Sequence, residues 1–438
     1  MINSKIFVKE GLQFFLAEKV ARRDIWRKKL LVEQWQQKNP EERKLQRQAL
    51  LERIVEYAFH RVPFYNDLFR RIRFDPRKIR KDIRFFQDIP FLTKETILSQ
   101  PMRFLSSDYV KNEFIEKKTS GSTGATFSFY YSREDLDWAS AVILYLNQAI
   151  ARDLSHREVY LIATDPKNKS VFSIEGLLER LKLFALNRAN IYVKDISPST
   201  SQSLLQLMKS EKPYLIYGLQ SILRAVIQSS NGASFHGLCQ YFISSGETLD
   251  EKAVAAISEA IGCKVINRYG NAEFGAVAQS ADDPLSLKFV EGIVYPENLT
   301  IQEYPEIVLT TLMGRAMPLL RYRTGDLGWL QENPDGSITL SNIHGRLNEI
   351  VTIEKKQFHT TFLASFLNNH FSIHDFQIVQ RSDGVFEFRI ITDYPDQLPN
   401  IKKKLTILTG GAIMVSRIRP SELIRKGHQR KFAYFIQE

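Results

Sequence analysis

The first 110 residues carry the hydrophobic spacing of helices. Between residues 5 and 60, apolar side chains recur every three or four positions. The Asn-Pro-Glu-Glu segment at 39–42 predicts a helix start, because proline is accepted in the first turn and acidic side chains favour that end. The Arg-Val-Pro segment at 61–63 then predicts a break. We therefore expect residues 1–110 to form a mainly helical layer.

From about residue 115 the pattern changes to short apolar strands that alternate with helices. Such alternation indicates an α/β architecture with a largely parallel sheet, followed by a more β-rich portion. The predicted strands span residues 127–131, 159–163, 241–245, 306–310 and 337–340, and the predicted helices span 174–186 and 219–229.

A domain boundary is predicted in the segment 345–349. The residues beyond it show two strands, a charged helix and a further strand, at 376–380, 386–391, 396–408 and 413–418. That order is typical of a small α+β domain. The predicted fold class is therefore α/β, with a large multi-sheet N-terminal domain over residues 1–345 that includes the helical layer, and a small α+β C-terminal lid over residues 346–438.

The chain carries a net charge of +11. Solvated helical faces explain most of this charge, and attraction of an anionic substrate or of a membrane surface remains open. No helix-turn-helix, zinc-finger or aromatic RNA-reading motif accompanies the basic residues, so no nucleic-acid partner is predicted.

Cysteines and apolar runs suggest a cytoplasmic protein. Cys239 and Cys263 form no CxxC pair, which argues against a disulfide framework or a cysteine zinc site. Lys9 and Glu10 interrupt the first apolar stretch, and no uncharged run is long enough to cross a bilayer. We therefore expect a soluble protein without an integral membrane segment.

A Thr-Ser-Gly-Ser-Thr-Gly segment at 119–124 is a candidate phosphate site. Glycines allow the backbone to turn N–H groups inward, and the hydroxyls add donors, so such a nest suits a polyphosphate. No Gly-Lys-Ser/Thr closes the segment, and it is therefore not the P-loop of the large NTPase class.

Two carboxylates follow glycines farther along the chain. Glu273 ends a Tyr-Gly-Asn-Ala-Glu segment after the strand expected at 263–266, and a carboxylate near a triphosphate is what a magnesium ion needs. Asp326 follows Gly325, which is expected in a tight turn. Asp326 is a candidate acceptor for a ribose diol, and the alternative interpretation is an aspartate that caps the turn.

These motifs, taken in order, resemble those of the adenylate-forming superfamily, which includes acyl-CoA ligases, luciferases and peptide-synthetase adenylation domains. The segments at 62–65, 92–94 and 316–323 look most like the phenylacetate–CoA ligase branch. The five motifs are Thr-Ser-Gly-Ser-Thr-Gly (119–124), Ser-Ser-Gly-Glu (244–247), Tyr-Gly-Asn-Ala-Glu (269–273), Tyr-Arg-Thr-Gly-Asp (322–326) and Gly-Arg-Leu-Asn-Glu (345–349).

The resemblance implies a site for ATP and Mg²⁺. The phosphate loop would consist of Thr119, Ser120, Gly121, Ser122, Thr123 and Gly124. The adenine side would be formed by Ser245, Gly246, Glu247, Tyr269, Gly270 and Asn271, with Tyr269 against the ring. Asp326 would bind the ribose, Arg346 would contact it at the hinge, and Glu273 and Thr123 would lie at the metal. The acyl pocket would involve residues 214–223.

Two positions depart from the family pattern. Ala125 stands where the phosphate loop usually continues with lysine. The lid lysine of the family usually follows a glycine, and here that residue is His428, so Lys431 is the candidate catalytic cation, with Lys426 and Arg430 as alternatives. His428 and Arg346 complete the predicted catalytic set.

The resemblance predicts an adenylate-forming ligase. It would activate a carboxylic acid as acyl-AMP with release of pyrophosphate, and would then transfer the acyl group to CoA, a carrier protein or an amine. One alternative is transfer of AMP to a hydroxyl of a cofactor-like substrate, and another is a degenerate nucleotide-binding protein without catalysis. A homodimer remains open.

Overall fold

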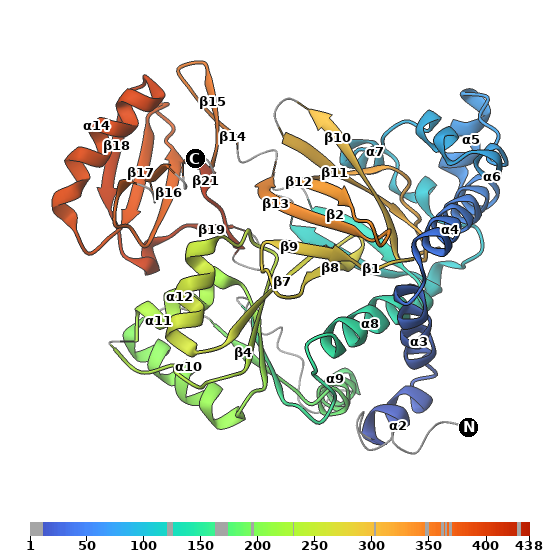
Figure 1. Ribbon diagram of the computed structural model, residues 1–438, viewed down its shortest axis with the longest axis horizontal. Coiled ribbons are helices and arrows are strands. Elements are labelled where there is room, and N and C mark those ends of the chain that lie inside the picture. The colour runs from blue at the N-terminus through green and yellow to red at the C-terminus, as the bar shows by residue number, and fades with distance from the viewer. Residues whose placement is uncertain are drawn as a thin grey trace.

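The computed structural model describes most of the chain (Figure 1). The described residues are 12–120, 126–162, 174–193, 197–230, 232–301, 304–346, 350–360, 363, 366–367, 370–426 and 431–438. Within them no helix is long and apolar enough to span a membrane.

Helices fill the N-terminal part, as the hydrophobic spacing predicts. Asn39 caps α4, because its side chain accepts a hydrogen bond from the Glu42 amide at 2.9 Å while the Glu42 carboxylate accepts one from the Asn39 amide at 3.1 Å. Pro63 starts the next helix directly after the predicted break. The helices are α2 (Leu12–Val20), α3 (Ile25–Gln36), α4 (Pro40–Arg61), α5 (Pro63–Arg71), α6 (Lys78–Lys81) and α7 (Lys94–Ser99).

The central feature is an eleven-stranded sheet with the order β10-β11-β12-β13-β9-β8-β7-β6-β5-β3-β4. Its strands are β3 (Glu158–Ile162), β4 (Arg188–Tyr192), β5 (Leu215–Gly218), β6 (Tyr241–Ser245), β7 (Lys264–Asn271), β8 (Gly275–Ser280), β9 (Ser286–Phe289), β10 (Val294–Ile301), β11 (Tyr304–Thr311), β12 (Tyr322–Glu332) and β13 (Ile338–Arg346). Strands β4, β3, β5, β6 and β7 run parallel to one another. The remaining neighbours in the sheet, from β7 through β8, β9, β13, β12 and β11 to β10, pair antiparallel. The prediction of a largely parallel sheet is therefore right for one half only.

Helices connect and cover the strands of the parallel half. They are α9 (Ile174–Ala185), α10 (Pro198–Glu211), α11 (Gln220–Gln228) and α12 (Glu251–Ile261). A separate hairpin, β1 (Ile115–Ser120) and β2 (Thr126–Tyr131), precedes α8 (Arg133–Gln148), a helix that the sequence patterns did not predict. The segment between the hairpin strands, 121–125, lies outside the described residues.

Two local predictions need correction. Tyr269, Gly270 and Asn271 lie within β7 instead of after it, because β8 pairs antiparallel with this end of the strand. Gly325 lies inside β12 at a φ of +76° instead of in a tight turn, next to an irregularity in the β11–β12 register. The Gly325 amide donates to the Glu306 carboxylate on β11 at 3.0 Å, which holds this irregularity in place.

The helical layer and the antiparallel half of the sheet share one hydrophobic core. Val55, Phe69 and Phe104 from the layer are fully buried with Val277 and Leu309 of the sheet. Residue Leu92 also forms an isolated parallel bridge to Tyr322 at the start of β12. The layer therefore braces the strand that carries the predicted ribose-binding aspartate.

The C-terminal part has its own sheet, with the order β18-β17-β16-β21, and its own core around Ile378, Phe388 and Leu405. This agrees with the α+β content expected there, while the domain limits at 345 and 346 stay a prediction. The elements are β14 (Ile350–Ile353), β15 (Lys356–His359), β16 (Asp375–Gln380), β17 (Phe386–Ile391), α14 (Leu398–Thr409), β18 (Ile413–Arg417), β19 (Arg425–Lys426), β20 (Lys431–Phe432) and β21 (Phe435–Gln437).

Candidate active site

Two of the predicted nucleotide motifs meet at one edge of the parallel strands. Strands β6 and β7 pair in parallel, with Ser245 opposite Arg268, so the end of the Ser-Ser-Gly-Glu strand lies beside Tyr269 of β7 at the same edge of the parallel strands. Gly246 adopts a φ of +90°, a conformation that glycine reaches without steric cost. Parallel pairing thus brings residues more than twenty positions apart to one place.

Tyr269 and Asp326 form the central contact of the site. The Tyr269 hydroxyl donates a hydrogen bond to the Asp326 carboxylate at 2.9 Å, and Asp326 is 9% exposed. Across the β12–β13 ladder, Asp326 lies opposite Arg346. The antiparallel half of the sheet therefore brings the predicted adenine, ribose and hinge residues together, although the Arg346 side chain is outside the description.

Glu273 lies in the turn between β7 and β8. The Tyr322 hydroxyl donates to the Glu273 carboxylate at 3.2 Å, and Tyr322 is only 2% exposed, so the carboxylate has a rigid partner. Asn271 shapes the turn by accepting a hydrogen bond from the Phe274 amide at 3.0 Å. Gly270 is required here, because a Cβ would lie 2.2 Å from the Gly275 carbonyl oxygen.

The predicted metal site rests on a single carboxylate. Among the described residues no cluster of three or more His, Cys, Asp or Glu side chains could hold a metal ion. Glu273 is half-buried at the site edge, which fits Mg²⁺, since this ion takes one or two carboxylates together with substrate phosphates. The metal role of Glu273 stays a prediction.

Glu247 is anchored at the start of α11. Its carboxylate accepts hydrogen bonds from the Ser221 amide at 3.1 Å and the Ser221 hydroxyl at 2.8 Å. A carboxylate at a helix N-terminus is stabilised by the unpaired amides and the helix dipole. Glu247 therefore holds the Ser-Ser-Gly-Glu segment against α11.

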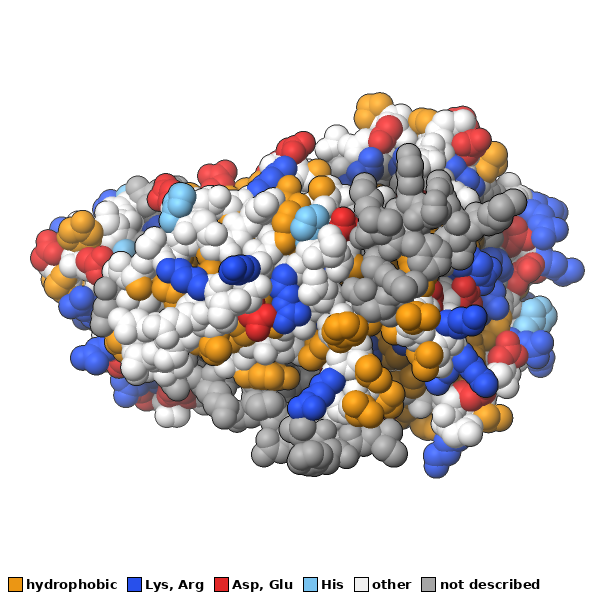
Figure 2. Space-filling view, turned by 90° about the horizontal axis from the view of Figure 1, so that it is seen from below, with side chains coloured by type: hydrophobic (Ala, Val, Ile, Leu, Met, Phe, Trp, Pro, Cys, Tyr) orange, Lys and Arg blue, Asp and Glu red, His pale blue; other side chains and the backbone are white. Residues whose placement is uncertain are grey.

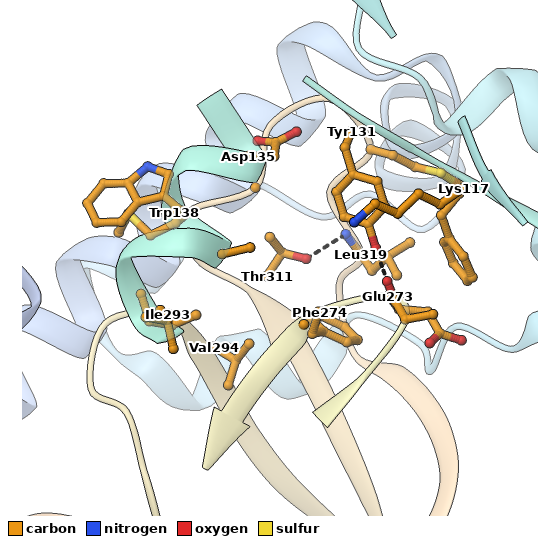
Figure 3. A pocket seen from close by; sticks show the side chains of 18 of the residues that line it. Lys117, Tyr131, Asp135, Trp138, Glu273, Phe274, Ile293, Val294, Thr311 and Leu319 are labelled. Atoms are coloured by element: carbon orange, nitrogen blue, oxygen red, sulfur yellow. Dashed lines mark hydrogen bonds between the residues drawn. The ribbon is translucent and has the colours of Figure 1, made fainter. Parts of the chain in front are cut away.

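A cavity of about 90 Å³ opens beside Glu273 (Figure 3). Lys117 and Tyr131 from the hairpin lie at the Glu273 end, whereas Trp138 of α8 and Ile293 lie at the apolar end. The Lys117 ammonium is 4.8 Å from the centroid of the Tyr131 ring, and the Tyr131 hydroxyl donates to the Ala272 carbonyl. Sequence reasoning missed Lys117, although it stands only two residues before the predicted phosphate segment.

Asp135 fixes the wall of this cavity. The Asp135 carboxylate accepts hydrogen bonds from the amides of Arg315 at 2.9 Å and Ala316 at 3.2 Å, which ties α8 to the segment before β12. It also pairs with Ser132 in the capping box of α8. Burial raises the pKa of Asp135, and these hydrogen bonds oppose that rise.

The segment 214–223, expected at the acyl pocket, forms β5 and the start of α11. Tyr217 stacks on Tyr160 with ring centroids 4.4 Å apart, and the Arg268 guanidinium lies 6.0 Å from the Tyr217 ring. Arg268 is 2% exposed and donates to Asn147 and Gln279. None of residues 214–223 lines the cavity beside Glu273, and their acyl-binding role stays a prediction.

The junction between the large sheet and the C-terminal part is held by charged groups. The Arg224 guanidinium on α11 donates to the His374 carbonyl at 2.6 Å and lies 3.6 Å from the Asp375 carboxylate. The Lys252 ammonium on α12 donates to the Ile373 carbonyl. Burial raises the pKa of Asp375, and the charge of Arg224 opposes that rise. Sequence reasoning singled out neither Arg224 nor Lys252.

Several predicted residues remain untested. Gly121, Ser122, Thr123, Gly124 and Ala125 lie outside the described residues, as does His428. Thr119 and Ser120 end β1 opposite Phe127 and Thr126, and Lys431 starts β20, but the positions of their side chains are not described.

No protein-family model matches this chain. The phenylacetate–coenzyme A ligase of Thermus thermophilus is 26% identical over 363 residues, which cover 77% of this chain and 78% of that protein. The crystal structure of a 2-hydroxyisobutyryl-CoA ligase in the postadenylation state with 2-HIB-AMP has a TM-score of 0.70 to this chain, at 17% identity over 89% of this chain and 88% of that one.

The predicted resemblance to the phenylacetate–CoA ligase branch of the adenylate-forming superfamily is confirmed. The fold prediction is also confirmed: an α/β part with a large sheet is followed by a small α+β part, as in these ligases.

The arrangement of the two parts carries further information. The same 2-hydroxyisobutyryl-CoA ligase in its thioesterification state has a TM-score of only 0.56 to this chain, at 19% identity over 91% of this chain and 90% of that one. Over a similar coverage, the fold of this chain thus matches the postadenylation structure of that ligase more closely than its thioesterification structure. The hydrogen bonds of Arg224 and Lys252 are among the contacts that join α11 and α12 to the C-terminal part.

Proposed function

We propose that this chain activates a carboxylic acid as acyl-AMP with ATP and then transfers the acyl group to coenzyme A. The observation that carries the proposal is the meeting of Tyr269, Asp326 and the Arg346 backbone, with Glu273 on the next turn. The similarity to a phenylacetate–CoA ligase supports CoA as the acceptor. Carrier proteins and amines are the alternative acyl acceptors to test beside CoA.

The chemistry needs no side-chain nucleophile. An oxygen of the substrate carboxylate forms a bond to the α-phosphorus of ATP, the α–β phosphoanhydride bond breaks, and pyrophosphate leaves. The thiol of CoA then attacks the acyl carbonyl after losing its proton, and AMP leaves. The enzyme contributes mainly by orienting these groups and by stabilising charge in a preorganised site.

The proposal gives a role to four residues of the site. The Asp326 carboxylate accepts hydrogen bonds from the ribose hydroxyls, and Tyr269 holds this carboxylate in position. Mg²⁺, held by Glu273 and phosphate oxygens, would neutralise charge on the phosphates. Lys117 supplies a cation on the hairpin that carries the phosphate loop, in a chain where Ala125 replaces the usual lysine of that loop.

Pyrophosphate exchange tests the proposal directly. A panel of aryl, arylacetic and short aliphatic acids should include at least one that drives exchange of pyrophosphate into ATP, and mass spectrometry should detect the matching acyl-AMP. Glu273→Ala and Asp326→Ala should abolish exchange. Asp282→Ala is a matched control, because the Asp282 side chain is 99% exposed and pairs only with Lys264 among the interactions described.

Two alternatives give different products. A protein that transfers AMP to a hydroxyl would show no carboxylate-dependent exchange and would leave AMP on its product. A nucleotide-binding protein without catalysis would release no AMP with any acid, and the two alanine variants would then behave like the native protein. Either outcome would contradict acid activation.

A further inference from the structure

Helix α9 exposes large hydrophobic side chains to solvent. The exposed fractions are 55% for Leu177, 60% for Leu178, 51% for Leu181 and 67% for Phe184. Four such residues on a twelve-residue helix form a contiguous apolar surface, whereas single exposed leucines are common on any soluble protein. The surface therefore needs an explanation.

Cations flank this apolar stripe. At about 100° per residue, Leu177, Leu181 and Phe184 lie on one side of the helix, and Leu178 lies next to them. Arg180 and Lys182, both exposed, fall on opposite sides of the stripe. Lys182 also has Glu179 at 3.6 Å, behind the apolar side. A stripe of leucine and phenylalanine between cations is typical of a helix that lies in a membrane interface.

Helix α2 extends the surface. It packs against α9, and the exposed fractions of its Leu16 and Val20 are 55% and 84%. Lys19 and Arg22, both exposed, stand beside them. Figure 2 views the molecule from below, the side on which α2 and α9 lie in Figure 1, and shows hydrophobic side chains gathered there beside Lys and Arg. We call this surface, formed by the exposed side chains of α2 and α9, the α2–α9 face.

We propose that the α2–α9 face docks on the surface of an anionic phospholipid bilayer. The apolar side chains would enter the interface between headgroups and acyl chains, and the cations would contact the anionic headgroups. No described helix is both long and apolar enough to span a membrane, and the proposed association is peripheral and reversible. The proposal is independent of the catalytic function proposed above.

Charge favours a bilayer over a second copy of the chain. The protein carries a net charge of +11, and a symmetric contact through the α2–α9 face would place the Arg180 and Lys182 pairs of two copies close together. Like charges in such a contact repel each other, whereas anionic headgroups complement them. A bilayer also accepts an apolar stripe without a matching groove.

Vesicle co-sedimentation tests the proposal with the full chain. We expect binding to vesicles of phosphatidylcholine mixed with phosphatidylglycerol, much weaker binding to pure phosphatidylcholine, and a decrease at high salt. Leu181→Asp combined with Phe184→Asp should weaken binding about a hundredfold, because two apolar side chains no longer enter the interface. Arg180→Gln should weaken it about fivefold.

Ile407→Asp provides the matched control, since Ile407 on α14 is 72% exposed and belongs to the C-terminal part. This variant should bind vesicles like the native protein, and all variants should keep the native melting temperature. The proposal is overturned if the native protein does not bind anionic vesicles, or if Ile407→Asp weakens binding as much as the α9 variant. It is also overturned if light scattering shows a dimer that the α9 variant dissociates, because the face would then bind a second copy.

Discussion

The Tyr269 hydroxyl on β7 donates a hydrogen bond to the Asp326 carboxylate on β12 at 2.9 Å. The two residues are 57 positions apart in sequence, and both are at least nine-tenths buried. The contact joins the predicted adenine-binding motif to the predicted ribose-binding motif. It therefore offers the most direct way to test the nucleotide site.

Tyr269→Phe removes the donor and keeps the ring. The Asp326 carboxylate then loses a partner in a buried position, which we expect to lower the free energy of unfolding by about 1–2 kcal/mol. The dissociation constant for ATP should rise about tenfold, because the carboxylate is no longer held in place. Urea unfolding and calorimetric titration with ATP measure the two effects. Tyr394→Phe, at a 53% exposed position, should change neither.

Tyr322→Phe tests the support of Glu273. Removing the hydroxyl that contacts the Glu273 carboxylate at 3.2 Å should raise the Mg²⁺ concentration for half-maximal activity about tenfold, the lower end for loss of an outer-shell partner. Glu273→Gln should have a larger effect in the same direction. Activity measured against Mg²⁺ at saturating ATP distinguishes this from a loss of ATP binding. Equal Mg²⁺ dependence in both variants and the native protein would contradict a metal role.

Lys117→Met tests the cation on the hairpin. Methionine keeps most of the length of the side chain and removes the charge, so KM for ATP should rise about tenfold, which corresponds to about 1.4 kcal/mol. The stability of the fold should stay nearly unchanged, because Lys117 lies at the rim of the cavity. Steady-state kinetics with ATP as the varied substrate measure the effect. Lys111→Met, at an exposed position before the same hairpin, is the control.

Arg224→Gln tests the junction with the C-terminal part. Arg224 and Asp375 are 9% and 12% exposed in their side chains, so removing the cation leaves a buried carboxylate uncompensated and should cost about 3 kcal/mol. Asp375→Asn in the same chain should restore part of this loss, and a double-mutant cycle in urea measures the coupling.

A matched control lies within the C-terminal part. Arg381 and Asp383 have the same nitrogen–oxygen distance of 3.6 Å but are 41% and 53% exposed, so Arg381→Gln should cost no more than about 0.5 kcal/mol. Arg224→Gln should also change the rates of adenylation and thioester formation unequally if the junction fixes the position of the C-terminal part. Equal slowing of both half-reactions would argue against that role.

Local sequence patterns were reliable wherever the structure depends on neighbouring residues. The helix start predicted at residues 39–42 is confirmed, because α4 begins at Pro40 and the two partners of its cap, Asn39 and Glu42, lie within one helical turn. The strands β3 and β6 are short apolar runs, and each lies within one residue of its predicted limits. The order of the motifs was sufficient to indicate the resemblance to the phenylacetate–CoA ligase branch, since each motif is a contiguous segment.

Pairing between distant segments was not predictable in the same way. The sequence gives no register for β7 against β8, so the extension of β7 through Tyr269 was missed. The irregularity at Gly325 depends on Glu306 of the neighbouring strand β11, and a glycine followed by aspartate looks like a turn when that strand is not known. Lys117 was missed because only the folded hairpin places it beside Glu273.

The sequence by itself determined the helical layer, several of the strands and the identity of the candidate nucleotide residues, because these follow from periodicity and from contiguous motifs. Only the tertiary structure decided that Asp326 meets Tyr269, that Tyr322 supports Glu273, and that Arg224 holds the C-terminal part. Each of these contacts joins residues at least 49 positions apart. Such contacts form when strand order and register are set by the packing of the whole core, which no local pattern encodes.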